Sequence, residues 1–117
     1  TPNGDSLITA SSDRTVKMWN FNSGQVLHTL TGHNNSVIAI AVNPDGKTLA
    51  SAGKDGIKIW DLTTGNLLKS LYGHSDWVSS LAFSPDGKML ASGGFDKTVR
   101  LWENKAPTLN ARLKNQK

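Results

Sequence analysis

The chain has 117 residues, of which 37% are hydrophobic and 19% are charged, and this globular composition excludes a disordered chain. It contains no cysteine, which excludes disulfides and thiolate chemistry, and no apolar run long enough to span a membrane. The formal net charge of +4 makes a nucleic-acid partner the first class to weigh.

The position of the charge argues against a nucleic-acid surface. Residues 1–104 contain nine lysines and arginines and nine acids, which cancel, so the whole excess comes from residues 105–117. Phosphate binding needs a clustered basic stripe, whereas this chain has a neutral body and a short basic tail. We interpret the tail as a solvated terminus. Nucleic-acid association through it is the weaker alternative.

The sequence repeats itself with a period of 41 or 42 residues, because the equivalent prolines Pro2, Pro44 and Pro85 are 42 and 41 residues apart. Each copy continues with a glycine, a short run ending in Ser or Thr, an aspartate and a tryptophan. Such a period is typical of a repeat protein. The middle copy is one residue shorter between Asp55 and Trp60.

Turn signals divide each copy into short strands, and no segment has a helical pattern. The first copy predicts three strands, near residues 7–9, at 16–20 and at 26–30. The second predicts strands at 37–42, 47–52, 57–61 and 67–71. The first of these, at 37–42, is apolar throughout, which predicts burial on both faces. The third predicts strands at 78–83, 88–93, 99–103 and, from the spacing of Leu109 and Leu113, at about 108–113.

The turns have their own signals. Residues 43–46 and 84–87 suit a type I turn followed by a left-handed glycine. Asp55-Gly56 predicts the centre of a tight hairpin, since both residues tolerate positive φ. Asp13-Arg14 and Asp96-Lys97 stand at the same place with weaker turn chemistry.

Together these motifs resemble the WD40-repeat family. The marks are Gly32-His33 and Gly73-His74, the Pro-Asp-Gly turns, the Leu-Ala-Ser runs, the turn aspartates and the pair Trp60-Asp61. The resemblance implies an all-β propeller of four-stranded antiparallel blades. It gives about 2.75 blades over residues 1–113, with a partial blade at 1–31, full blades at 32–72 and 73–113, and a basic tail at 114–117.

Two sets of serine, histidine and aspartate contain every member of a serine-hydrolase triad. A catalytic site has no reason to recur once per repeat, and no oxyanion hole or cleft is signalled. The resemblance instead implies buried structural tetrads, and we expect no catalytic residue. The implied sets are His33, Ser51, Asp55 and Trp60; His74, Ser92, Asp96 and Trp102; and a partial set of Thr9, Asp13 and Trp19.

The resemblance also implies that partners bind at the narrow end of the propeller channel. The family's recognition positions fall on Ser12, Ser36, Ile38, Lys54, Trp77, Ser79 and Phe95. Trp77 and Phe95 stand out, since aromatic side chains dominate interface hot spots. The alternative for Trp77 is packing against the neighbouring blade.

We therefore expect a non-enzymatic, cytoplasmic scaffold for a protein or peptide partner, without cofactor, metal or membrane. The mid-repeat start favours the C-terminal part of a larger propeller, with self-assembly of copies as the other source of the remaining blades. The alternative function is the sensor or targeting segment of a larger signalling enzyme, kinase or protease-like, whose catalytic domain lies upstream.

Overall fold

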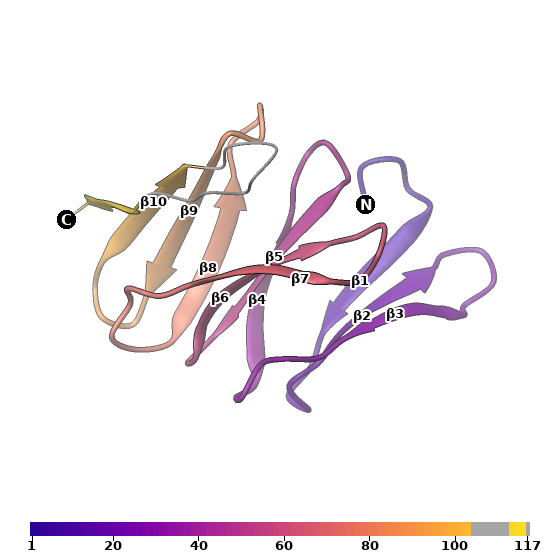
Figure 1. Ribbon diagram of the computed structural model, residues 1–117, viewed down its shortest axis with the longest axis horizontal. Coiled ribbons are helices and arrows are strands. Elements are labelled where there is room, and N and C mark those ends of the chain that lie inside the picture. Colours follow the sequence, from indigo (N-terminus) through magenta and orange to yellow (C-terminus); the bar gives the residue numbers. More distant parts are fainter. Residues whose placement is uncertain (104–112, 117) are drawn as a thin grey trace.

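The computed structural model describes residues 1–103 and 113–116. These residues form three antiparallel sheets that stand side by side (Figure 1), which we call blades 1, 2 and 3. Blade 1 has the order β1-β2-β3, blade 2 the order β4-β5-β6-β7, and blade 3 the order β8-β9-β10-β11. The expectation of an all-β fold with three, four and four strands is confirmed. No helix in this part of the chain is long and apolar enough to span a bilayer.

The bounds of the strands are as follows. Blade 1 contains β1 (Ser6–Ala10), β2 (Val16–Asn20) and β3 (Val26–Leu30). Blade 2 contains β4 (Val37–Val42), β5 (Thr48–Gly53), β6 (Gly56–Asp61) and β7 (Leu67–Leu71). Blade 3 contains β8 (Val78–Phe83), β9 (Met89–Gly94), β10 (Val99–Glu103) and β11 (Leu113–Gln116).

The Pro-Asp-Gly turns connect the first two strands of blades 2 and 3. Gly46 and Gly87 both have φ of 73°, which an L side chain adopts only with strain. Each closes its turn by donating its backbone N–H to the residue three places earlier, Asn43 at 2.8 Å and Ser84 at 2.9 Å. The predicted left-handed glycine is present in both turns.

The tight hairpin of blade 2 differs from the prediction. Gly53 pairs with Gly56, so the two loop residues are Lys54 and Asp55, and Gly56 (φ 102°) already begins β6. Asp55 does not take the predicted positive φ. In the other blades Arg14 (φ 75°) and Lys97 (φ 66°) adopt the positive φ that Gly56 has in blade 2.

Two apolar clusters hold the three blades together. The first lies between blades 1 and 2 and contains Val16 and Leu30 on one side and Leu49 and Trp60 on the other. The second lies between blades 2 and 3. It contains Ala50, Ala52, Ile57, Ile59 and Leu71 of blade 2, with Val78, Leu90 and Trp102 of blade 3. Blade 2 therefore packs its tryptophan face on blade 1 and its Ile face on blade 3.

The prediction that 37–42 is buried on both faces holds only in part. Both faces contact an apolar cluster, Ala39 between blades 2 and 3 and Ile40 and Val42 between blades 1 and 2, but most of the strand is not fully buried. Val37 is buried, but Ile38 is 44% exposed and the rest of β4 is half-buried. The physical reason is position, because β4 is an edge strand of blade 2 and has a paired strand on one side only. An apolar run thus marks an inner edge strand here and not a strand in the middle of a sheet.

The last strand extends further along the chain than predicted. The expected strand at 108–113 falls mostly on residues 104–112, which are outside the described residues. The described strand is β11, which pairs with β10 from Trp102–Leu113 to Val99–Gln116. Residues 114–116, predicted to be part of a frayed tail, therefore belong to a strand of blade 3.

Candidate functional site: polar tetrads and the loop end

The four polar residues implied for blade 2 meet in one chain of hydrogen bonds. His33 precedes β4, Ser51 lies in β5, Asp55 in the β5–β6 hairpin and Trp60 in β6. His33 Nδ1 lies 2.9 Å from Asp55 Oδ1, and His33 Nε2 lies 2.7 Å from Ser51 Oγ. Trp60 Nε1 donates to the same Ser51 Oγ at 2.7 Å. Asp55 also accepts the backbone N–H of Asn34 at 2.7 Å, which ties the loop before β4 to the hairpin.

The chemistry of these groups assigns the protons. An ionised carboxylate only accepts hydrogen bonds, so His33 Nδ1 donates to Asp55. In a neutral imidazole Nε2 then accepts the hydroxyl proton of Ser51, whose oxygen accepts from Trp60. Every polar group in the tetrad is satisfied, which is what burial requires.

Blade 3 repeats the arrangement. His74 Nδ1 lies 3.0 Å from Asp96 Oδ2, His74 Nε2 lies 2.8 Å from Ser92 Oγ, and Trp102 Nε1 donates to Ser92 Oγ at 3.0 Å. Asp96 gains two bonds that Asp55 lacks, because the Thr98 hydroxyl donates to it at 2.7 Å and the Thr98 N–H at 3.1 Å. Thr98 stands at the place where the middle copy is one residue short.

The hydrogen bonds hold both aspartates ionised. Burial by itself would raise the pKa of Asp55, but the bonds from His33 and from the Asn34 N–H outweigh it and lower the pKa. For Asp96, burial also acts to raise the pKa, and bonds from the Thr98 hydroxyl, the Ser75 N–H and His74 hold it well below its usual range.

The partial set of blade 1 is only partly joined. Trp19 Nε1 donates to Thr9 Oγ1 at 3.0 Å, as its counterparts do to serine. Asp13 instead accepts the Thr15 hydroxyl at 2.6 Å and the Thr15 N–H at 3.0 Å, within its own exposed turn. The Thr15 hydroxyl is the main cause that lowers the pKa of Asp13.

The serine, histidine and aspartate of each full tetrad are connected as in a hydrolase triad, but a substrate cannot reach the serine. Ser51 is 0% exposed and Ser92 is 1% exposed, so no substrate carbonyl can reach either hydroxyl. The tryptophan N–H also donates to the serine oxygen and so engages one of its lone pairs. A nucleophile needs an open approach and an oxyanion site about 3 Å away. Buried serines of this kind cannot do acyl transfer.

The implied recognition positions gather at one end of the blades, which we call the loop end. It consists of the β1–β2, β5–β6 and β9–β10 hairpins with the segments before β4 and β8, on the lower side of Figure 1. Ser12, Lys54 and Phe95 lie in the hairpins. Ser36 and Trp77 come just before β4 and β8, and Ile38 and Ser79 lie within these strands.

Backbone contacts fix the two aromatic residues of the loop end next to each other. Phe95 N donates to Trp77 O at 2.9 Å, and Asp76 Oδ1 accepts the Trp77 N–H at 2.7 Å. Phe95 is 60% exposed, whereas Trp77 is half-buried. Solvent can therefore reach a large part of the Phe95 ring and part of the Trp77 side chain.

The other loop-end positions are spread over all three blades. Ser36 Oγ donates to Ser12 O at 3.3 Å, which joins blade 2 to blade 1. Ser79 Oγ donates to Gly93 O at 3.4 Å within blade 3. Lys54 and Ile38 are exposed on blade 2.

Sequence reasoning missed one contact between blades. His28 of β3, which its place in an outer strand predicts to face solvent, is half-buried against the turn of blade 2. A Cβ built on Gly65 would lie 2.8 Å from His28 Nδ1. The Thr64-Gly65 turn could have indicated this contact, because Gly65, with φ of 78°, has no side chain and leaves room for a close neighbour.

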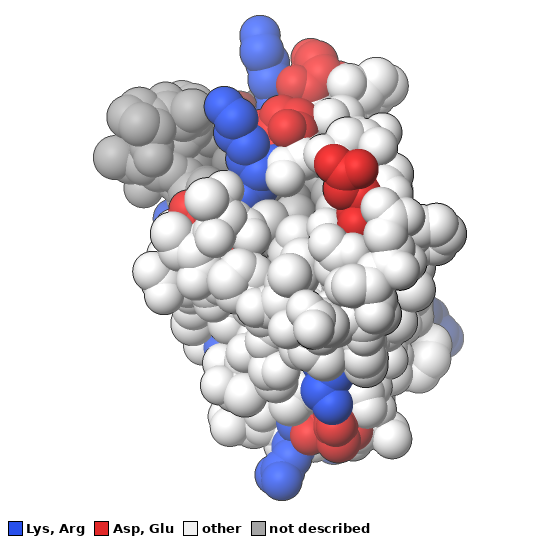
Figure 2. Space-filling view, turned by 90° about the vertical axis from the view of Figure 1, so that its right-hand side faces the viewer, with Lys and Arg blue, Asp and Glu red and all other residues white. Residues whose placement is uncertain are grey.

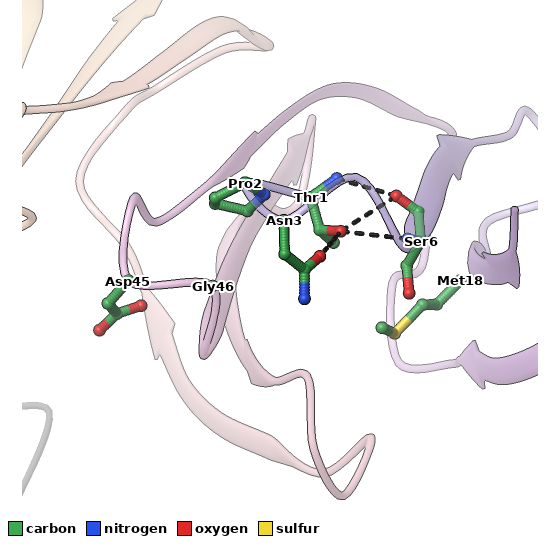
Figure 3. Close-up of a pocket in the computed structure, with 7 residues that line it drawn as sticks. All are labelled: Thr1, Pro2, Asn3, Ser6, Met18, Asp45 and Gly46. Carbon is green, nitrogen blue, oxygen red and sulfur yellow. Dashed lines mark hydrogen bonds between the residues drawn. The ribbon is translucent and has the colours of Figure 1, made fainter.

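The structure also contains a small hollow at the opposite end, of about 180 Å³, between the first turn of the chain and the Asp45-Gly46 turn. Its polar groups at the first turn are paired with one another (Figure 3), since the Thr1 amino group donates to Ser6 O at 2.8 Å and the Thr1 hydroxyl to Asn3 Oδ1 at 2.9 Å. They leave no convergent set of free donors for a ligand. Within the described residues, no group of three His, Asp or Glu side chains could hold a metal ion.

Comparison with known proteins agrees with this geometry. The family profile described as "WD domain, G-beta repeat" matches residues 1–20, 24–61 and 65–103. The solved structure of U3-55K superposes on 99% of this chain with a TM-score of 0.90 and 29% sequence identity, and the chain covers 37% of it.

Two curated relatives match shorter stretches. Small ribosomal subunit protein RACK1y of Oryza sativa subsp. japonica is 46% identical over 55 residues, which are 47% of this chain and 16% of that protein. Nuclear distribution protein PAC1 of Mycosarcoma maydis is 48% identical over 48 residues, which are 41% of this chain and 11% of that protein. The chain thus matches less than a fifth of either relative. On its motifs, its stacked blades and the profile match over most of its length, the chain belongs to the WD40-repeat family.

Proposed function

We propose that this chain is a non-enzymatic scaffold that binds a protein or peptide at its loop end. The observation that carries the proposal is the Trp77–Phe95 pair. The backbones of the two residues are hydrogen-bonded, Phe95 is 60% exposed and Trp77 is half-buried. Aromatic side chains offer a large contact area and lose little conformational entropy on binding, which is why they dominate hot spots. Ile38, also exposed at this end, adds an apolar contact.

The polar tetrads have a structural role in this proposal. Each one links the loop before a blade to that blade's hairpin, so the loop-end residues sit on a rigid base. A partner then meets a preorganised surface and does not have to order it, which saves entropy on binding. The burial of both serines supports this role over a catalytic one.

We further propose that these blades work within a larger ring. The chain covers 37% of the U3-55K chain on which it superposes, and the end blades each have one sheet face without a neighbour in the described structure. The relatives' small covered shares, 16% and 11%, are in keeping with this.

A peptide library tests the recognition surface. Random peptides displayed on phage would be selected on the wild-type chain, and their dissociation constants measured for wild type, Trp77→Ala and Phe95→Ala. We expect each substitution to weaken binding by about 2 kcal/mol, roughly 30-fold, while the melting temperature stays near that of the wild type.

The matched control is Leu68→Ala, an apolar residue that is 45% exposed on β7, away from the loop end. Peptides that bind Trp77→Ala and Phe95→Ala as tightly as the wild type would contradict the proposed site. A large loss of melting temperature in Trp77→Ala would assign that residue to the contact between blades.

A further inference from the structure

Each blade carries an apolar row that crosses its sheet at the tryptophan. In blade 2 the row is Leu49, Trp60 and Leu67, which are direct partners in neighbouring strands. In blade 3 Leu90 and Trp102 pair in the same way, and in blade 1 the row is Leu7, Trp19 and Val26. We call these three sets the tryptophan rows.

The inner part of the row is covered in blades 2 and 3 and open in blade 1. The outer-strand ends do not differ, since Leu67 of blade 2 is 44% exposed and Val26 of blade 1 is 45% exposed. Leu49 and Leu90 are 0% and 1% exposed because the preceding blade packs on them, whereas their counterpart Leu7 is 51% exposed. Trp60 and Trp102 are buried, and Trp19 is only half-buried. Figure 2 views the molecule from the blade 1 side, where the middle of the surface consists almost entirely of uncharged residues and charged side chains gather toward both ends.

The opposite face of each blade shows the converse pattern. Val16 and Ile57, which cover the tryptophan rows of blades 2 and 3, are 0% and 1% exposed. Their counterpart in blade 3 is Val99, and it is 49% exposed. Beside Val99 lies a hollow of about 160 Å³ whose lining includes Ser80, Ala82, Ala91 and Gly93. Small side chains there leave room for a bulky row, as Ala50 and Ala52 do for blade 3.

We infer that the open tryptophan row of blade 1 packs on the open Val99 face of blade 3 from a second copy of this chain, head to tail. The argument is continuity with an interface that the chain already makes twice. Each internal contact joins one tryptophan row to one Val or Ile face, and the described structure leaves one of each kind uncovered. A second copy is therefore a partner whose complementary surface is seen in this structure.

This contact is separate from the recognition surface, since neither Trp77 nor Phe95 belongs to a tryptophan row or to the Val99 face. It supplies neighbouring blades for the larger ring proposed above. A head-to-tail contact is heterologous, which means that two different patches meet. Each patch can therefore be removed on its own.

The test uses Leu7→Asp and Val99→Asp in the full 117-residue chain, with molar mass measured by size-exclusion chromatography and light scattering. We expect the wild type to be larger than a monomer and each variant alone to be a monomer. An equimolar mixture should form a one-to-one dimer, because Leu7→Asp keeps an intact Val99 face and Val99→Asp keeps an intact tryptophan row. Leu68→Asp, which alters an equally exposed leucine on β7 of the middle blade, should assemble as the wild type does.

A folded wild-type monomer overturns the inference, and so does an aggregate that neither substitution disperses. If one variant alone still dimerises, the same patch of each copy forms the contact, and the head-to-tail arrangement is wrong. Circular dichroism checks that both variants fold, and Leu7→Lys with Val99→Lys replaces any that does not. Trp77→Ala should assemble normally, so failure of the recognition surface and failure of this contact are distinguishable.

Discussion

The Ser51 hydroxyl receives a hydrogen bond from Trp60 Nε1 and lies 2.7 Å from His33 Nε2, with no surface open to solvent. The serine of a catalytic triad is also hydrogen-bonded to a histidine, but its hydroxyl faces an open cleft. Burial rather than residue type decides between the two roles. In this chain the residues that resemble a catalytic set link the loop before each full blade to that blade's hairpin, and we propose that this link is their role.

Substitution at the tetrad tests this role at the scale of single residues. Asp55→Asn removes the carboxylate that accepts from His33 Nδ1 and the Asn34 N–H. Leaving these donors without a good acceptor should cost about 1–3 kcal/mol of unfolding free energy. Urea denaturation followed by tryptophan fluorescence measures it.

The chain provides a matched control in Asp13→Asn. Asp13 has the same place in blade 1, but its bonds stay within one exposed turn. We expect it to destabilise the protein less than Asp55→Asn. Equal effects from the two substitutions would mean that the histidine link adds nothing.

The lowered pKa values of Asp55 and Asp96 also predict a pH dependence. A folded-state pKa below the unfolded value means that the folded protein binds the proton less readily. The stability from these groups is therefore complete above the ordinary aspartate pKa of about 3.9 and is lost as pH falls through it toward the folded values. The melting temperature should drop between about pH 5 and about pH 2. In the double variant Asp55→Asn with Asp96→Asn the drop should be shallower, and an unchanged slope would contradict the assignment.

Single residues also show what the sequence could and could not predict. The family resemblance was enough to predict that His33, Ser51, Asp55 and Trp60 meet. It could not show that Thr98 bonds to Asp96, because this depends on the one residue by which the copies differ in length. Nor could the turn signals place the hairpin at Lys54 and Asp55, since Gly56 carries the same signal one residue later.

At the scale of strands and turns, the contact of His28 with the Gly65 turn joins blade 1 to blade 2. The equivalent Gly24 in blade 1 has the same left-handed conformation, with φ of 71° against 78°, but a Cβ added there would meet nothing within 4 Å. Substitutions in the two turns therefore distinguish the cost of backbone strain from the cost of disturbing the contact between blades.

We expect Gly65→Ala to destabilise the protein more than Gly24→Ala. Both substitutions place an L side chain at positive φ, which costs about 1–2 kcal/mol. Only Gly65→Ala also forces its new Cβ to within 2.8 Å of the His28 ring. Thermal unfolding measures both, and His28→Ala should recover part of the loss in Gly65→Ala only. Recovery in neither variant, or equal losses in both, would contradict a contact between blades.

The alternation of side chains predicted which strand faces would be apolar, and burial followed it where a neighbour exists. Val16 and Ile57 are buried, while Val99, with the same alternation, is 49% exposed. Similarly, the apolar run of β4 did not predict burial, because an edge strand lacks a second neighbour. Alternation gives the direction of a side chain, and only the arrangement of the sheets determines what covers it.

At the scale of the whole molecule, three stacked blades give two different kinds of surface. The end faces carry exposed apolar residues, Leu7 and Val99, at positions whose counterparts are buried between blades, and we propose that they meet in the same way. The loop end combines exposed aromatic and polar residues on a rigid base, which suits recognition of a partner. The fold class followed from the repeat, whereas the loop end stays a proposed recognition surface, and the identity of a partner depends on side-chain chemistry outside this chain.

The division between supporting tetrads and a recognising loop end is the central claim, and one paired measurement tests it directly. Binding of a library-selected peptide and the melting temperature would be measured for Trp77→Ala and Asp55→Asn, with binding recorded well below both transitions. We predict that Trp77→Ala loses binding and keeps its melting temperature, and that Asp55→Asn loses melting temperature and keeps binding. The opposite pattern, with binding lost in the folded Asp55→Asn variant and stability lost in Trp77→Ala, would contradict it.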